Sequence, residues 1–325
     1  MNQEKLKVRP LNIVLAPPVA KAEAAAIAPG IQPTPDHDLI FRGGATIANL
    51  NFMNFYVGGD SWQPSDTQSI DAALAAAMSD TNLNNVMVQY FSSGAITSFF
   101  LGSQILPGGA PAVFSQGDVE ALVTSFSDSG ALDKFDLSST LLNCMLPSGT
   151  VLNTDANVTA NQQVSFAALV PKDSADSTNG LGGYHGSVHP PRTDGQPTIY
   201  YAVGVFSEIR PDGTANGIPV FDQPWKNVVA TFYHELNEAR TDADVEDAIK
   251  AGNDPSATNF LGWVSAQGEE CGDFPVFEAR PLTQVFQEVP LTDGSGTVPI
   301  QFQYSNFVHG PEGPRPDPAP PSPTS

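Results

Sequence analysis

Basic residues are scarce in this sequence, and their scarcity excludes several classes of partner. Only 14 of the 325 residues are Lys or Arg, whereas 35 are Asp or Glu, so the formal net charge is −21. Such a surface repels nucleic acid and anionic lipid, because neither offers it a positive charge. It attracts cations, including metal ions. We therefore expect no nucleic-acid partner.

Long apolar runs and cysteines are also few. No run of about 18 apolar residues occurs, so we expect no transmembrane segment. The basic start and the apolar stretch LNIVLAPPVA are similar to a signal peptide, but Pro17 and Pro18 interrupt a run that is already short. The sequence thus has no clear signal peptide, which leaves the cytoplasm or non-classical secretion as its location. The two cysteines, Cys144 and Cys271, fix no compartment, and the sequence leaves their pairing open.

The chain does contain enough apolar material for a folded core. Apolar residues make up 41% and are spread throughout, which excludes wholesale disorder. Residues 1–38, rich in Ala and Pro, predict an irregular N-terminal arm. The C-terminal HGPEGPRPDPAPPSPTS, 309–325, has few groups that can pack and predicts a disordered, Pro-rich tail. Residues 39–308 are then expected to form a single domain.

Strand and helix patterns are mixed, without regular alternation, through residues 39–308. That mixture predicts an α+β fold in which a mixed sheet packs on a long helix. Runs rich in β-branched and aromatic residues predict strands at 39–43, 45–57, 85–91, 141–145, 164–170 and 198–206, with short strands within 283–308. Helical spacing predicts helices at 65–79, 118–126 and about 224–250, the last opened by Pro224.

The long helix carries the candidate site, in the stretch TFYHELNEARTDAD. At 100° per residue, one face is an apolar stripe directed at the core. The residues of this stripe are Trp225, Val228, Val229, Phe232, Leu236 and Ala239. His234 and Glu238 are four residues apart, so they lie together on the opposite side, and Glu235 lies between the two faces. The stretch almost spells the metalloprotease signature, with Glu238 where a second histidine is expected.

This spacing suits metal chemistry. Two ligands one turn apart can bind one ion, and a carboxylate directly after the first ligand can take a proton from a water molecule. The alternative is the polar face of an ordinary solvated helix. Two neighbouring segments favour the metal. The apolar strand TIYYAVGVF precedes the helix, as does the cleft-lining strand of zinc peptidases. After the helix, GWVSAQGEECGDF offers Glu269, Glu270 and Asp273 as a third ligand, unless these form an exposed acidic turn.

At these segments the chain resembles a known family. HELNEARTDAD followed by GWVSAQGEECGD is similar to the HELAEAxTDP…GW…EIGDxC pattern of the phosphate-induced, EXORDIUM-like proteins and their bacterial and fungal relatives. FRGGATIANLNFMNFYVGG, LLNCMLPSGT and GGYHGSVH are similar to further segments of that family, in the same order, over about residues 39–280. The resemblance implies a zincin-like domain. The positions that match the family pattern are His234, Glu235, Glu238, Glu270 and Asp273.

From these matches we assign each residue a role in a metal site, as a hypothesis. His234 and Glu238 would bind the ion, with Glu270 or Asp273 as third ligand. Asp242 and Asp244 are competing third ligands.

Three further residues would serve the reaction rather than hold the ion. Glu235 would be the general base. Tyr184 or His185 would donate a hydrogen bond to a developing oxyanion, the alternative for His185 being a loop histidine that fixes a turn.

Glu238 in place of a second histidine widens the choice of metal ion, and the sequence allows more than one function. One imidazole with two carboxylates makes an ion a weaker Lewis acid than several imidazoles do, and such an oxygen-rich site suits Ca²⁺ or Mn²⁺ as well as Zn²⁺. The sequence predicts a zinc-dependent, metallopeptidase-type hydrolase acting on a peptide bond. One alternative is a non-catalytic, metal-stabilised protein of the same fold that binds a peptide or glycan. The other is an acidic structural protein without an ion. Oligomeric state and substrate stay open.

Overall fold

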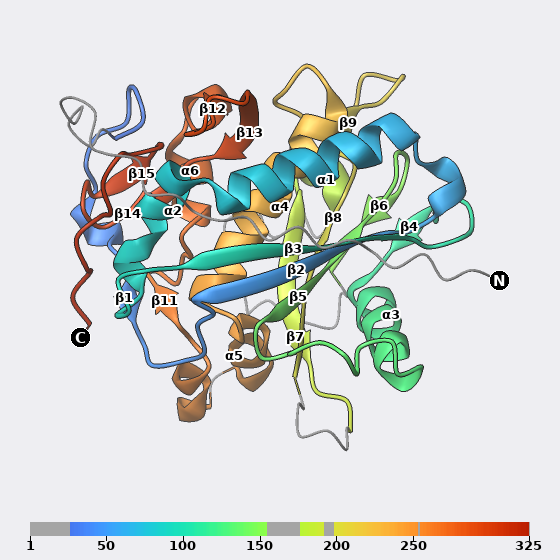
Figure 1. The fold of residues 1–325 in the computed structure, drawn as a ribbon, viewed down its shortest axis with the longest axis horizontal. Coiled ribbons are helices and arrows are strands. Elements are labelled where there is room, and N and C mark those ends of the chain that lie inside the picture. Colours follow the sequence, from blue (N-terminus) through green and yellow to red (C-terminus); the bar gives the residue numbers. More distant parts are fainter. Residues whose placement is uncertain (1–26, 155–175, 192–197, 253, 325) are drawn as a thin grey trace.

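A computed structural model describes residues 27–154, 176–191, 198–252 and 254–324. Its centre is a five-stranded sheet in the order β3-β2-β5-β8-β7 (Figure 1). The strands are β2 (Asn49–Tyr56), β3 (Thr97–Ile105), β5 (Thr140–Met145), β7 (Gly183–Val188) and β8 (Ile199–Gly204). All neighbours are parallel except the edge strand β7, which runs antiparallel to β8. The sheet is therefore mixed, as predicted, within a mixed α/β structure.

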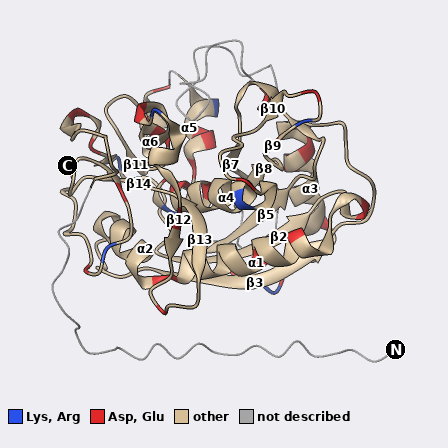
Figure 2. Ribbon diagram, turned by 90° about the horizontal axis from the view of Figure 1, so that it is seen from above, with Lys and Arg blue, Asp and Glu red and all other residues tan. Residues whose placement is uncertain are grey.

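Helices cover both faces of the sheet. On one face, α1 (Pro64–Ser79) and α4 (Pro224–Thr241) pack against each other and share one apolar core with β2. On the other face, α3 (Gln116–Asp128) shares a second core with β5 and β8. Every residue of β5 and β8 is buried, because each strand has packed layers on both sides. Figures 1 and 2 show these layers from two directions, and the colouring of the ribbon in Figure 2 also shows that basic residues are few.

Shorter elements complete the described chain. Three further helices are α2 (Thr81–Met87), α5 (Val245–Ala251) and α6 (Asp273–Glu278). The remaining strands are β1 (Ile40–Phe41), β4 (Val113–Phe114), β6 (Val151–Leu152), β9 (Glu208–Ile209), β10 (Ala215–Asn216), β11 (Trp263–Val264), β12 (Phe286–Pro290), β13 (Thr297–Gln301), β14 (Gln303–Ser305) and β15 (Gly310–Glu312). Within the described ranges, no helix has both the length and the apolar character needed to cross a bilayer.

Several predicted elements are confirmed, and others are wrong for identifiable reasons. The helices predicted at 65–79 and 118–126 are α1 and α3, and the strands within 283–308 include the hairpin β12–β13. The strand predicted at 85–91 is instead the end of α2 and a 3₁₀ turn, Val88–Tyr90. Asp80 caps α2 by accepting a hydrogen bond from the Leu83 amide at 3.1 Å. The strand predicted at 164–170 lies outside the described residues.

The long predicted helix is divided in two. α4 ends at Thr241, because Asp242 takes φ −148° and leaves the helical region, and α5 begins at Val245. This break turns the chain directly after the stretch that carries His234, Glu235 and Glu238. It separates the candidate ligands Asp242 and Asp244 from the residues of α4.

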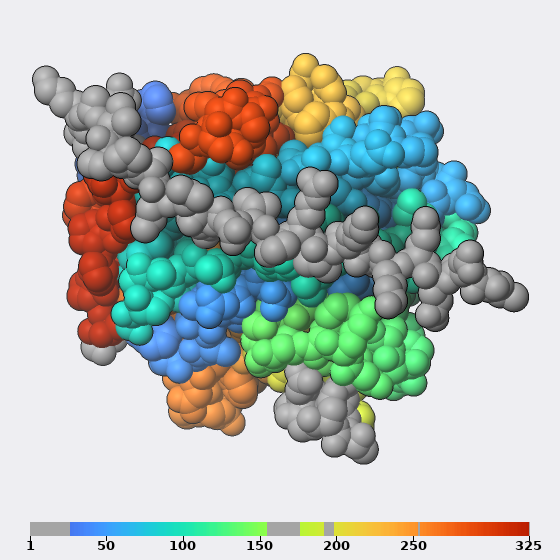
Figure 3. Space-filling view, viewed as in Figure 1, coloured from blue at the N-terminus to red at the C-terminus, as the bar shows by residue number. Residues whose placement is uncertain are grey.

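The C-terminal segment is ordered, which contradicts the predicted disordered tail. β15 pairs with β14, and Ile27 of the N-terminal segment bridges to Glu312. Beyond β15, the backbone amides of Arg315, Ala319 and Ser322 donate to carbonyls of α2 and the turn after it, at 2.8–3.2 Å. Figure 3 shows this segment in red along one edge of the molecule. Its order comes from backbone hydrogen bonds rather than apolar burial, so its composition gave no sign of it. Of the predicted arm, residues 1–26 lie outside the described residues.

Ending the chain after Glu312 is expected to destabilise the protein while leaving β15 in place. The truncation removes three backbone hydrogen bonds to the region of α2, and also the carbonyls that accept from the Asn85 side chain. At about 0.5–1.5 kcal/mol for each hydrogen bond, we expect a loss of about 1–4 kcal/mol in the free energy of unfolding, measured in urea. An unchanged urea midpoint would show that the segment contributes nothing to stability.

Candidate metal centre

Helix α4 is buried around its whole circumference, which excludes a solvated polar face. Each residue from Asn227 to Thr241 is buried. The predicted apolar stripe does face the core between α1 and the sheet. The polar side is covered too, because β7, β8 and the hairpin strand β13 pack on it. The exposed fractions of His234, Glu235 and Glu238 are only 3%, 2% and 1%.

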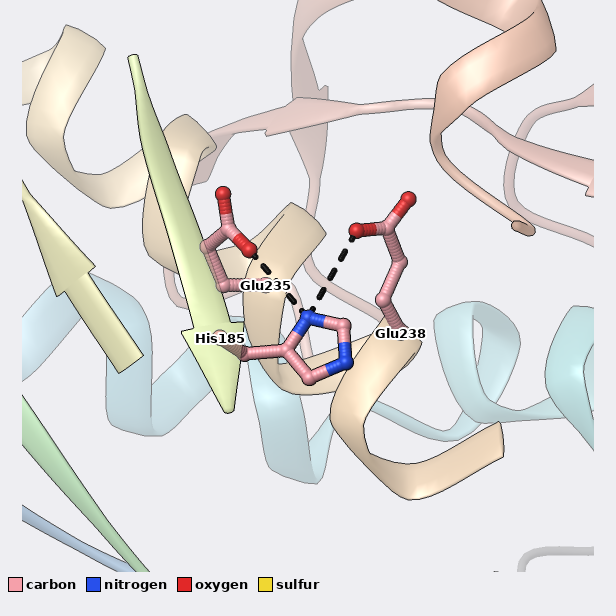
Figure 4. A group of neighbouring side chains, drawn as sticks. All are labelled: His185, Glu235 and Glu238. Carbon is pink, nitrogen blue, oxygen red and sulfur yellow. Dashed lines mark ion pairs between the residues drawn. The ribbon is translucent and has the colours of Figure 1, made fainter. Parts of the chain in front are cut away.

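Ionisable side chains from four parts of the chain meet on this covered side. They are His185 on β7, three residues of α4, Asp242 after α4, Glu270 in the turn before α6 and Asp273 at the start of α6. All seven are buried: His185, His234, Glu235, Glu238, Asp242, Glu270 and Asp273. Figure 4 shows His185 directed from its strand towards Glu235 and Glu238 on the helix. Burial of this many charged groups requires partners for them.

His234 is held by Gln301 of β13. The amide nitrogen of Gln301 donates to the carbonyl oxygen of Gly272, which fixes the orientation of the side chain. The Gln301 oxygen therefore faces Nδ1 of His234, at 2.8 Å, and can only accept a hydrogen bond from it. Nδ1 must carry the proton, and Nε2 faces Glu238 Oε2 at 3.0 Å. The imidazole is thus oriented with Nε2 directed at Glu238, which is the orientation that a metal-ligating histidine would need.

Glu238 and Asp273 complete a three-residue group with His234. One donor atom from each of the three lies within 4.8 Å of the other two. The second oxygen of Glu238 accepts from the Gly272 amide at 3.0 Å, and Asp273 Oδ2 accepts from the Glu270 amide at 3.0 Å. Asp273 Oδ1 is buried without a hydrogen-bond partner in the described structure, as are Glu270 Oε1 and Asp242 Oδ2. Buried unpartnered carboxylate oxygens are the donors that a divalent cation would satisfy.

Electrostatics in the cluster reflect this crowding of carboxylates. Burial raises the pKa of Glu270 and of Asp273 well above its usual range, and the charge of Glu238 raises both further. Burial also raises the pKa of Asp242, to about 7. Burial alone would lower the pKa of His234, but the surrounding carboxylates, Glu238 first, raise it to about 10. Without a cation, the cluster therefore retains protons.

His185 takes a different place from the one predicted. Its Nε2 lies 3.1 Å from the carbonyl oxygen of Asp242, and its Nδ1 lies 3.5 Å from Glu235 Oε2. Both ring nitrogens face groups inside the cluster, and His185 lies on strand β7 rather than in a loop. The sequence identified the residue but not its partners.

The other predicted residues divide between the centre and its surroundings. Tyr184 packs with the second core, on the opposite face of β7 from His185, so the structure does not bring it to the cluster as the oxyanion prediction requires. Glu269 Oε2 contacts His37 and Ser265, each at 2.7 Å. Asp244 belongs to a separate group with His189 and Asp247 nearer the surface. Cys144 and Cys271 are both free thiols.

A small pocket adjoins the centre. It is lined by side chains of α4, by the start of β7 and by the hairpin: Gly182, Gly183, Ile218, Thr231, His234, Glu235, Phe286 and Gln301. Glu235 Oε1 lies on its β7 side, since a Cβ placed on Gly183 would be 3.0 Å from that oxygen. The pocket thus brings a general-base candidate and a ligand candidate to one opening.

Gln301 is a residue that sequence reasoning missed, and replacing it tests the tautomer argument. In Gln301→Leu, His234 loses its acceptor and the turn at Gly272 loses a donor. Loss of a partner that orients a metal ligand typically weakens binding about 10- to 100-fold, and we expect that decrease for Zn²⁺ by competition with a chelator. Gln287→Leu is the matched control, because that amide donates to the carbonyl of Gln284 in the turn before β12. Equal zinc affinity in both variants would contradict the role of Gln301.

Comparisons with known proteins add little to this geometry. No family model matches the chain. No curated protein matches it. Among solved structures, metalloproteinase-II from Bacteroides fragilis is similar at 14% identity and a TM-score of 0.26, over 50% of this chain and 38% of that chain. The chain therefore spans well under half of that protein, and a likeness of this size carries no argument. The evidence for the site is therefore the geometry of its own residues.

Proposed function

We propose that this protein is a metal-dependent hydrolase of the metallopeptidase type, with a zincin-like domain and Zn²⁺ as its ion. The observation that carries the proposal is the buried group of His234, Glu238 and Asp273, with donor atoms within 4.8 Å and Glu235 beside it. The orphaned oxygen of Asp273 and the fixed Nε2 of His234 fit a cation that accepts nitrogen and oxygen donors.

Each residue then has a task. His234, Glu238 and Asp273 would hold the ion, and Glu270 would lie behind them, with Oε1 3.5 Å from His185 Nε2. A bound zinc ion lowers the pKa of water and polarises a carbonyl oxygen. Glu235 takes the proton from the attacking water at Oε1, on the pocket side, and delivers it to the leaving amine. Burial raises the pKa of Glu235, which makes it a better proton acceptor than an exposed carboxylate.

The substrate follows from the surroundings of the pocket. Glycines and apolar side chains line it beside the edge strand β7, which suits an extended peptide better than a charged polymer. The net charge of −21 argues against nucleic acid. A glycan in the same pocket is the alternative ligand for a non-catalytic protein.

Metal content tests the proposal. The purified full chain is expected to contain zinc by elemental analysis, and His234→Ala is expected to lose the ion of that group. His309→Ala is the matched control, because His309 also pairs with a carboxylate, Asp38, at 2.9 Å but is half-exposed. If the chain neither contains nor takes up Zn²⁺, Mn²⁺ or Ca²⁺, the proposal is wrong and the protein is the acidic structural protein without an ion.

A further inference from the structure

Two imidazoles from different elements face one carboxylate oxygen. His234 Nε2, on α4, lies 3.0 Å from Glu238 Oε2, and His185 Nδ1, on β7, lies 3.8 Å from the same oxygen. The sequence predicts a single ion and gives His185 no part in holding it. The structure places a second nitrogen donor where that prediction has none.

The outer nitrogen of each ring has a partner that only accepts hydrogen bonds. His234 Nδ1 faces the amide oxygen of Gln301, and His185 Nε2 faces the backbone carbonyl of Asp242. Each partner requires a proton on the outer nitrogen of a neutral ring, which leaves a lone pair on the inner nitrogen. Metal-ligating histidines are held in this way. Here the arrangement occurs twice around one glutamate.

Each imidazole also belongs to its own group of donors. His185, Glu235 and Glu238 form one buried group, and His234, Glu238 and Asp273 form another, with donor atoms in each within 4.8 Å. Glu238 is common to both. The two histidines do not fall into one such group within the described chain, so a single ion at ~2 Å bond lengths would not reach both without rearrangement.

Charge favours two ions over one. Five buried carboxylates meet here: Glu235, Glu238, Asp242, Glu270 and Asp273. Among the described residues, no Lys or Arg forms an ion pair with any of them. One divalent cation would offset two of the five carboxylate charges, whereas two would offset four. Glu270 Oε1, buried and without a hydrogen-bond partner in the described chain, lies 3.5 Å from His185 Nε2 and adds negative charge on that side.

We propose that the centre takes two divalent cations bridged by Glu238, one held by His234 and Asp273 and the other by His185 and Glu235. The proposal rests on the metal site of the proposed function and adds a second ion to it. Glu235 would use Oε2, which faces His185, and would keep Oε1 on the pocket side for proton transfer. Glu238 would be the one side chain that both ions need.

Stoichiometry tests this proposal without any assay of activity. The full chain is stripped with a chelator, dialysed against excess Zn²⁺ and then against buffer, and analysed for bound metal. We expect two ions per chain, falling to one in His185→Ala and to one in His234→Ala, with Glu238→Gln below either. With Mn²⁺ in place of Zn²⁺, electron paramagnetic resonance is expected to show exchange coupling between neighbouring ions, and the coupling should vanish in either histidine variant.

The outcomes separate this proposal from the proposed function. One ion per wild-type chain, lost in His234→Ala, overturns the two-ion centre and leaves the hydrolase proposal standing. No ion in the wild type overturns both. His189→Ala is the control, because His189 belongs to the separate group with Asp244 and Asp247. If that variant alone falls from two ions to one, the second ion lies at the surface group and the proposal is wrong. If a variant fails to fold, the number of ions per wild-type chain and the exchange coupling of its Mn²⁺ ions still distinguish one ion from two.

Discussion

Glu235→Gln is expected to lower kcat for peptide hydrolysis by about 10²–10⁴-fold, because an amide cannot accept the proton of the attacking water. The change keeps the size of the side chain, so the ion of His234 and Asp273 should remain bound. A mixture of quenched fluorogenic peptides provides the readout, with zinc content measured on the same sample. Loss of turnover while the ion of His234 and Asp273 stays bound assigns a chemical role to Glu235 rather than a structural one.

Glu312→Gln is the matched control for this experiment. Glu312 is also buried, but it pairs with Arg315 in the C-terminal segment, away from the centre. We expect it to retain wild-type kcat, whatever it does to stability. If the wild type cleaves no peptide and Glu235→Gln leaves the metal content unchanged, the centre is structural and the protein belongs to the non-catalytic alternative.

Gly272→Ala is expected to displace His234 and weaken zinc binding about 10- to 100-fold, with a loss of about 1–3 kcal/mol in the free energy of unfolding. The backbone of Gly272 is right-handed helical, at φ −95° and ψ −22°, and so accepts any residue. The obstacle is space. A methyl group there would overlap the imidazole of His234 and lie 2.9 Å from Glu238 Oε1. One added carbon therefore acts on two proposed ligands.

Gly109→Ala is the control for Gly272→Ala. A Cβ at Gly109 would have no neighbouring atom within 4 Å, and its backbone is not left-handed. Its zinc affinity and unfolding midpoint should equal those of the wild type. If Gly272→Ala also binds zinc like the wild type, the ring of His234 has room to move and the centre is less rigid than its hydrogen bonds indicate.

The sequence predicted the parts of the site that depend on local geometry. His234 and Glu238 are four residues apart on a helix, so their proximity follows from helical periodicity alone. Asp273 was predicted through its motif, and its meeting with His234 is seen in the structure. The role of Gln301 could not be predicted from the sequence. Its contact with His234 joins residues 67 apart and depends on the packing of the hairpin on α4. No local pattern encodes such a contact.

What the sequence did not predict has physical causes. Tyr184 and His185 are adjacent on an edge strand, so only one of them can face α4, and the sequence does not say which. The apolar run at 85–91 is buried on most sides, and such a run has neither the alternation of a half-exposed strand nor a clear helical stripe. The C-terminal prolines suggested a free tail, although the amides between them bind backbone carbonyls.

The enclosure of α4 by α1, β7, β8 and β13 has a consequence for dynamics. Amide protons of residues 227–241 have no route to solvent through a local fluctuation, since each residue is covered by another layer. Their hydrogen–deuterium exchange should occur only when the whole domain opens. The segment bearing the ionisable cluster would then be among the last to become labelled, and the rate of its labelling would measure global unfolding directly.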